Sequence, residues 1–400
     1  MKMNMLKKLS TVSAASIAIC GVLHAQVYWD INGTNAGATD STDASGTWDI
    51  ATTSNWNTTS DGTAAVTTFT DTDSVVFSAG NNVATAAITA TGTPTATNLT
   101  IEEGTYTFDG NLKLGTSATY TVSSGASATF NDAVSLTDNS DFIIEGTSSM
   151  KLAGAGKTFT KTGSGTLTLT DSANSDYAIN VNEGLVVVNR TATKQLKSIV
   201  VGASGTLQLS TSDQLNPLTV NGLFIVDEGV SDSLRQLYGT GSIQAGDNTS
   251  LNIDKGDFSG DISGDLDISI SKTNGFTFND GSSVEFVIGA DGVSNSITSG
   301  DANMSELNLN GELTFDLTGA DLTEGNSWLI VEVAGLTVSY GATFSVAGFS
   351  ELDGTWTHDS NALLQFSETT GYLTVVPESS SYALLAGCLG LTFVMLRRRK

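Results

Sequence analysis

Residues 159–170 read FTKTGSGTLTLT, and residues 181–188 read VNEGLVVV. After a Gly in each segment, apolar residues recur at alternate or neighbouring positions, which is typical of a strand with one buried face. Thr and Val are β-branched and favour the extended backbone of a strand. The two segments therefore predict β-strands that are joined by a polar connection.

The same arrangement repeats along the chain, because a Gly precedes each of a series of alternating runs at nearly regular intervals. Strands of a sandwich show turns about every 8–12 residues. A repeat of about 20 residues in β-type sequence, as found in this chain, instead indicates a solenoid. The pattern predicts an all-β parallel β-helix, and a positive φ is the expected reason for Gly at each corner. The repeating glycines are Gly104, Gly125, Gly146, Gly165, Gly184, Gly205, Gly222 and Gly241.

In such a solenoid one set of alternate side chains fills the interior, and the other set faces solvent. The sequence predicts Leu167, Leu169, Leu207 and Leu209 inside, with the intervening Thr residues outside. The spacing of Gly becomes irregular after residue 280, although strand-like runs continue. We therefore expect a β-rich C-terminal cap.

Residues 159–188 resemble the autotransporter-associated β-strand repeat, which reads K-x-G-x-G-x-L-x-L, then a polar loop, then V-x-x-G-x-L-x-V. The resemblance is close over this stretch and weaker in the flanking repeats. It implies a right-handed β-helix, of the kind that forms the passenger region of secreted surface proteins.

The segment 1–25 has the features of a secretory signal peptide. Lys2, Lys7 and Lys8 precede a mostly apolar stretch that ends at the small residue Ala25. We expect cleavage between Ala25 and Gln26 and export of the rest of the chain.

The C-terminal residues have a distinct composition. Val376, Pro377, Glu378 and Ser379 precede the apolar run 382–396, and the chain ends in Arg397, Arg398, Arg399 and Lys400. The apolar run predicts a single membrane-spanning helix with its basic end in the cytoplasm. This order resembles the PEP-CTERM sorting domain of Gram-negative bacteria. The resemblance implies recognition of residues 376–379 by an exosortase, a membrane-embedded protease, although Ser379 stands where the family usually has a second Pro.

The charge of the chain excludes several classes of function. The formal net charge is −25, and residues 26–376 hold 10 basic against 41 acidic residues. Nucleic-acid binding requires a basic surface, so that partner is excluded. The same region holds no Cys and one His, His358. One His and no Cys cannot provide the ligands of the usual zinc site. In a Ser-His-Asp site, His358 would have to be the general base.

Carboxylate pairs are abundant in so acidic a sequence. A glycosidase pair or a weak Ca²⁺ site remains an alternative to ordinary solvated surface at these positions. The pairs are Asp71 with Asp73, Asp257 with Asp261, and Asp265 with Asp267. We expect no other cofactor and no enzyme activity.

The region 26–95 contains three tryptophans, Trp29, Trp48 and Trp56. These residues are expected to form an aromatic N-terminal cap, because an open solenoid end must be covered. The alternative is that their rings are exposed for stacking against sugars. Arg190, near Lys194 and Lys197, is the place where an anionic glycan would meet local positive charge.

Together these features predict an organisation and a function. The expected regions are the signal peptide (1–25), an N-terminal cap with the first rungs (26–95), solenoid repeats (96–280), a C-terminal β region (281–376) and a sorting tail (377–400). We expect a structural or adhesive protein of the cell surface or extracellular matrix, anchored transiently or stably in a Gram-negative envelope. Its expected partners are an exosortase and extracellular polysaccharide. The alternative is a β-helix protein that binds or cleaves extracellular polysaccharide.

Overall fold

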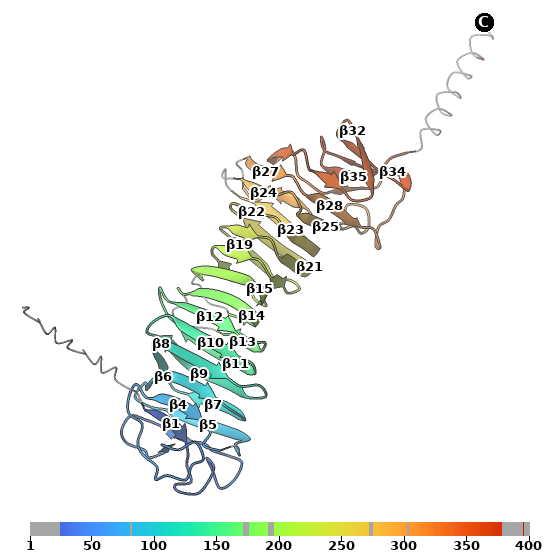
Figure 1. Ribbon diagram of the computed structural model, residues 1–400. Coiled ribbons are helices and arrows are strands. Elements are labelled where there is room, and N and C mark those ends of the chain that lie inside the picture. The colour runs from blue at the N-terminus through green and yellow to red at the C-terminus, as the bar shows by residue number, and fades with distance from the viewer. Residues whose placement is uncertain are drawn as a thin grey trace, which may run out of the picture.

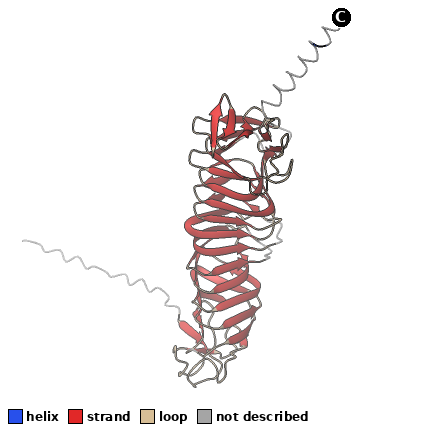
Figure 2. Ribbon diagram, turned by 90° about the vertical axis from the view of Figure 1, so that its right-hand side faces the viewer, coloured by secondary structure: helices blue, strands red, loops and turns tan. Residues whose placement is uncertain are grey.

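The computed structural model describes residues 25–80, 82–170, 176–190, 196–271, 275–301, 304–377 and Met395. Its elements are β-strands, which stack into one elongated column (Figures 1 and 2). The column is a parallel β-helix, because strands at equivalent positions of successive rungs pair in parallel. The predicted all-β solenoid is therefore confirmed.

The first strand of each rung belongs to a parallel ladder that we call ladder A. Each of its members pairs with the next one along the chain. They are β1 (Gln26–Trp29), β4 (Ser74–Phe77), β6 (Thr95–Ile101), β8 (Leu112–Val122), β10 (Ser140–Ile144), β12 (Thr158–Thr162), β14 (Ala178–Val188), β15 (Ser198–Leu209), β17 (Leu218–Val220), β20 (Leu237–Gly239), β22 (Gly256–Phe258), β24 (Phe276–Phe278), β27 (Ser305–Leu309) and β30 (Leu336–Tyr340).

After a corner the chain enters a second parallel ladder, ladder B, to which β14 and β15 contribute their C-terminal halves. The other members of ladder B are β2 (Gly46–Trp48), β5 (Thr85–Ala90), β7 (Thr105–Asp109), β9 (Ser127–Leu136), β11 (Thr147–Ala153), β13 (Thr166–Leu169), β18 (Leu223–Val226), β21 (Ser242–Ile253), β23 (Asp261–Ile270), β25 (Ser283–Val287), β28 (Glu312–Asp316) and β31 (Ser345–Val346).

A third set of pairings, ladder C, leads each rung back toward ladder A. It includes the ends of β9, β11, β21 and β23 and the first residues of β6 and β8. It also includes the short strands β16 (Gln214–Leu215), β19 (Ser231–Leu234) and β26 (Ile297–Ser299). The chain therefore passes from A to B to C in each turn before it starts the next rung.

The interior is filled by the predicted alternate residues. Leu167, Leu169, Leu207 and Leu209 are fully buried. Thr166, between Gly165 and Leu167, points to the other side and stays half-exposed. Equivalent residues lie above one another on successive rungs, so that Leu167 pairs with Val186, and Val186 with Leu207. Burial of each such side chain contributes about 1.5–3 kcal/mol to the free energy of unfolding.

The corner between ladders A and B requires glycine. At most of its positions the reason is not the expected positive φ. Gly165, Gly222 and Gly241 do not have a positive φ. A Cβ atom on any of them would instead collide with the carbonyl oxygen of the glycine at the same corner of the preceding rung. The regular Gly repeat therefore reflects close stacking of backbones at this corner, where no side chain fits.

Aromatic residues fill the interior at the N-terminal end of the column. Trp29, Trp48 and Trp56, the last in β3 (Trp56–Asn57), are completely buried. Their rings pack at 5.1–5.7 Å from one another and from Phe69 and Phe77. The Trp29 indole N–H also donates a hydrogen bond to the Ala44 carbonyl at 2.7 Å.

The other end of the column carries a five-stranded antiparallel sheet. Its order is β29 (Ser327–Leu329), β35 (Tyr372–Val375), β34 (Asn361–Ser367), β33 (Thr355–His358) and β32 (Phe349–Leu352). The parallel ladders pass through residue 281 without a break and continue to β31. The change of architecture thus lies well after the point at which the Gly spacing becomes irregular.

The predicted targeting segments lie almost entirely outside the described residues. Those described include Ala25 and Gln26 on the two sides of the predicted cleavage site, and Val376 and Pro377 at the start of the predicted sorting motif. Glu378, Ser379 and most of the predicted membrane-spanning run 382–396 are not among them. Among the described residues, no helix is both long enough and apolar enough to cross a membrane.

Candidate functional site

The residues that sequence reasoning offered for glycan contact are buried. Trp29, Trp48 and Trp56 have 0% exposure, and so does Arg190. A sugar needs an accessible ring face or an accessible guanidinium, and these side chains present neither. The structure therefore contradicts the prediction of glycan contact at all four positions. The tryptophan rings pack against other aromatic rings, and the Arg190 guanidinium forms an ion pair with Asp213 inside the solenoid.

Arg190 lies in a buried polar cluster at the end of β14. Its Nη2 lies 2.7 Å from the Asp213 Oδ2, and neither side chain is exposed. Its Nε also donates to Asp213 Oδ2 at 2.8 Å, and its Nη1 donates to the Tyr177 hydroxyl at 3.3 Å. These contacts supply the charge and the hydrogen bonds that a buried guanidinium needs. Arg190 therefore connects two rungs from within.

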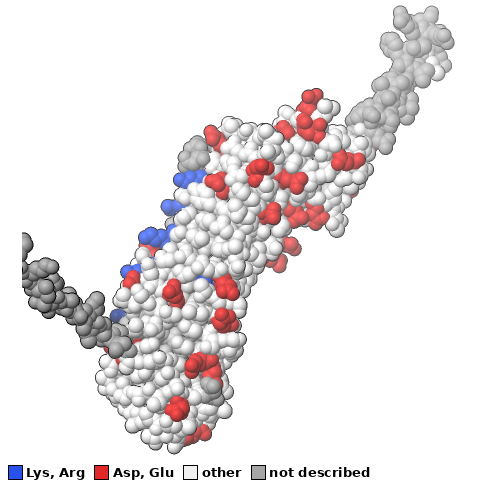
Figure 3. Space-filling model, in the orientation of Figure 1, with Lys and Arg blue, Asp and Glu red and all other residues white. Residues whose placement is uncertain are grey.

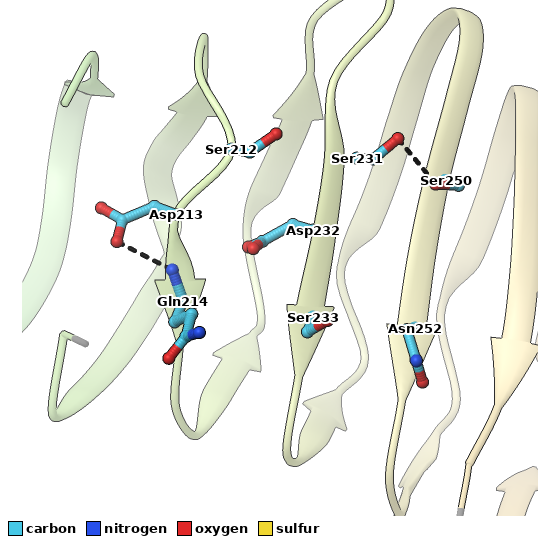
Figure 4. Close-up of a pocket in the computed structure, with 8 residues that line it drawn as sticks. All are labelled: Ser212, Asp213, Gln214, Ser231, Asp232, Ser233, Ser250 and Asn252. Atoms are coloured by element: carbon cyan, nitrogen blue, oxygen red, sulfur yellow. Dashed lines mark hydrogen bonds between the residues drawn. The ribbon is translucent and has the colours of Figure 1, made fainter. Parts of the chain in front are cut away.

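A surface groove of about 420 Å³ lies over this cluster on ladder C (Figure 4). Its rim carries hydroxyl and amide side chains at equivalent positions of successive rungs: Gln214 pairs with Ser233, and Ser233 with Asn252. The hydroxyl of Ser250 donates to that of Ser231 at 2.9 Å. The groove can therefore form hydrogen bonds with a polar ligand along the axis of the solenoid.

Asp213 and Asp232 also border the groove, at equivalent positions of neighbouring rungs. They alternate with the outward Gln214 and Ser233, and both are buried. No described residue forms a hydrogen bond with the Asp232 Oδ2. Burial, together with repulsion from the Asp213 carboxylate, raises the pKa of Asp232 to about 8, although backbone N–H groups act in the opposite sense. Asp232 is therefore a neutral acid at moderate pH.

This pKa predicts how stability depends on pH. The pKa of Asp232 is about 8 in the folded state and near 3.8 in the unfolded state. The folded state thus holds one more proton between these values, so the contribution of Asp232 to the free energy of unfolding falls as pH rises from about 4 to about 8. The charged groups that face this carboxyl are Asp213 and, beyond it, Arg190.

We expect the melting temperature of the Asp232→Asn variant to fall less than that of the unaltered chain between about pH 5 and about pH 8.5, because most of this window lies between the unfolded and folded pKa values of Asp232. Differential scanning calorimetry of both proteins in the same buffers measures this difference. Other buried acids contribute equally to both proteins, so they cancel in the comparison. Parallel curves for the two proteins would contradict the assignment.

Lys161, in the motif K-x-G-x-G, is a residue whose role the sequence did not reveal. Its side chain is completely buried at the corner between ladders A and B. Nζ donates to the carbonyl oxygens of Gly163 at 2.6 Å and Glu183 at 3.0 Å. A Cβ on Gly184 would lie 2.7 Å from this Nζ. The Lys and glycines of the motif therefore form one structural unit that fastens two rungs.

The predicted carboxylate pairs do not converge on a common ligand. Asp265 accepts from the backbone N–H of Asn248, whereas Asp267 accepts from that of Ser296. Asp71 and Asp73 accept from the backbone N–H groups of different residues, and Asp257 and Asp261 accept from side chains of the next rung. The described part of the chain contains no group of three or more His, Cys, Asp or Glu residues that could hold a metal ion.

His358, the one histidine of the region 26–376, is part of the antiparallel sheet. Its Nδ1 accepts from the backbone N–H groups of Ser360 at 3.2 Å and Asn361 at 3.0 Å. Its ring packs edge-on against Phe349, with centroids 5.0 Å apart. These contacts give His358 a role in shaping the turn after β33.

The predicted cleavage site lies at the start of the first described strand. Gln26 is the first residue of β1 and pairs with Ser74, and the backbone N–H of Ser74 donates to the Ala25 carbonyl at 2.9 Å. At the other end, Val376 and Pro377 follow directly after β35. No family model matches this chain, and no curated protein or solved structure shows a significant similarity to it.

Proposed function

We propose that this protein is an exported structural or adhesive β-solenoid of the cell surface or extracellular matrix. The observation that carries this proposal is the continuous stack of parallel rungs from β1 to β31, held together by backbone pairing and by the glycine corner. Such a stack provides length and stiffness, and each rung depends only on its neighbours.

The proposal includes the finer features of the fold. The solenoid is right-handed, the buried tryptophan cluster closes its N-terminal end, and the five-stranded sheet closes its C-terminal end. The signal peptide 1–25 directs export, and the run 382–396 forms the anchoring helix. An exosortase-type protease recognises residues 376–379 in a Gram-negative envelope.

A structural role is favoured over an enzymatic one by the state of the side chains that could do chemistry. Arg190 and Asp213 neutralise each other in the interior, Asp232 is turned inward, and His358 holds a turn. Most carboxylates of the acidic pairs accept hydrogen bonds from a neighbouring rung. We therefore do not assign polysaccharide cleavage to this protein, whereas polysaccharide binding requires none of these groups.

Fractionation of the native cells, followed by intact-mass measurement of the recovered protein, tests the proposal. We expect the protein in the surface or extracellular fraction, with Gln26 as its first residue and without Arg397–Lys400. A cytoplasmic protein with an intact N-terminus would contradict export. A surface protein that retains the C-terminal arginines would contradict processing by an exosortase but not export.

A further inference from the structure

The solvent-accessible cations gather on one side of the column. The described Lys and Arg residues that reach solvent are Lys113, Lys151, Lys157, Lys197, Arg235 and Lys255. Figure 3 shows the basic side chains along one edge, while acidic side chains are spread over the face toward the viewer. Although acidic residues greatly outnumber basic ones, the solvent-accessible basic side chains lie in one region of the surface.

Most of these cations occupy the corner at which ladder C leads into ladder A. Lys157 directly precedes β12, Lys197 directly precedes β15, Lys255 directly precedes β22, and Arg235 stands two residues before β20. We call them the corner cations. Thr158 pairs with Ala178, and Ala178 with Ser198, so Lys157 and Lys197 lie at the same corner two rungs apart. Their backbones are therefore separated by about 10 Å along the axis.

Among the described residues, the corner cations have no ion-pair partner. The salt bridge in this part of the chain joins Arg190 to Asp213. The same corner also carries Asp138, Asp176 and Asp254, which reduce its net charge. A Lys or Arg at the surface that is not held in a salt bridge keeps a long, adaptable side chain ready for an external anion.

We propose that the corner cations form a binding edge for an extended anionic polysaccharide of the uronic-acid type, which lies parallel to the solenoid axis. The inference deepens the proposed adhesive function and rests on it for its biological setting. A linear polyanion suits the site because the cations recur at one corner along the axis, on rungs whose strands pair in parallel.

A second copy of this chain fits the edge less well. Several carboxylates on or beside ladder B are already engaged: Glu145 accepts from the Ser164 hydroxyl, Asp261 from that of Ser283, and Asp227 from Gln208. These acids would have to give up hydrogen bonds to meet cations of another column. The carboxylates of a free polysaccharide have only water and counterions to lose.

Retention of the full chain on immobilised polygalacturonate tests the proposal. The chain is purified in a zwitterionic detergent, and EDTA is present so that calcium cannot bridge two anions. The combined variant K157Q, K197Q, R235Q and K255Q is compared with a control variant, K113Q with K151Q, which changes cations of ladder C instead. All these side chains reach solvent, so we expect both variants to fold, and their melting temperatures verify this.

We expect the unaltered chain and the control variant to bind at low salt and to be released at high salt, because the contacts are between exposed charges. The combined variant should bind at least about tenfold more weakly, since several charge contacts are lost together. Neutral dextran should not retain any of the proteins.

Several outcomes would overturn the inference. They are absence of retention, equal retention on dextran, or equal loss in the control variant. Salt-sensitive self-association that disappears in the combined variant, without retention on the polysaccharide, would assign the edge to a second copy of the chain. The binding measurement uses purified protein, so its failure would leave the proposed surface location intact, and a failed fractionation would leave the binding result intact.

Discussion

The Gly241→Ala variant is expected to lose about 3 kcal/mol or more of its free energy of unfolding, at the upper end of the range for overpacking. The added Cβ would overlap the carbonyl oxygen of Gly222, and it would also lie within 2.8 Å of the Gly222 backbone nitrogen. Neither atom belongs to a movable side chain, so the rungs would have to separate at this corner. The loss of stability should appear as a lower urea midpoint and a lower melting temperature.

Gly319→Ala is the matched control for this prediction. Gly319 also lacks a positive φ, and a Cβ there would meet the Ile288 carbonyl oxygen at 3.4 Å, an ordinary contact. We expect this variant to be as stable as the unaltered chain or slightly more stable, because Ala restricts the unfolded chain. Equal stability of the Gly241 and Gly319 variants would show that the corner can widen, and that close backbone stacking is not the reason for the Gly repeat.

The Asp213→Ala variant is expected to lose about 3–5 kcal/mol of its free energy of unfolding, because it removes the carboxylate that neutralises the buried Arg190 guanidinium. Both side chains have 0% exposure, so the ion pair is shielded from solvent in the folded chain. Tyr177 retains its contact with Arg190 but supplies no negative charge to it. Urea denaturation followed by circular dichroism measures the loss.

The double variant Arg190→Met with Asp213→Leu separates the value of the pair from the cost of a single charge. Replacing a buried ion pair by apolar residues of similar volume is often neutral or stabilising. We therefore expect the double variant to be more stable than the Asp213→Ala variant. If all these proteins had the same urea midpoint, Arg190 would have to reach solvent, which its burial in the structure contradicts.

Much of the fold could be predicted from local pattern. Alternation assigned Leu167 and Leu207 to the interior, and the Gly interval indicated stacked rungs of about 20 residues. These features are visible in sequence because each rung repeats the same short-range geometry. The physical reason for the Gly interval was not visible: a positive φ and a close approach of two backbones both select glycine, and the second depends on the neighbouring rung.

The candidate sites were less predictable. Trp48 and Arg190 are residue types that occur both in binding surfaces and in buried clusters, and their surroundings come from residues distant in sequence. Arg190 meets Asp213 of the following rung, and Trp29 packs against Phe77. The same limit applies to Lys161, whose partners lie on two rungs.

The sequence by itself determined a repeating parallel β-solenoid and its large negative charge, because strand alternation, turn residues and charge counts are local properties. The tertiary structure decided which polar side chains face inward and which cations share an edge. Lys157 and Lys197 are far apart in the chain, yet they are placed at one corner by rung-to-rung pairing. That alignment depends on the register of the rungs, which the interval between glycines alone does not specify.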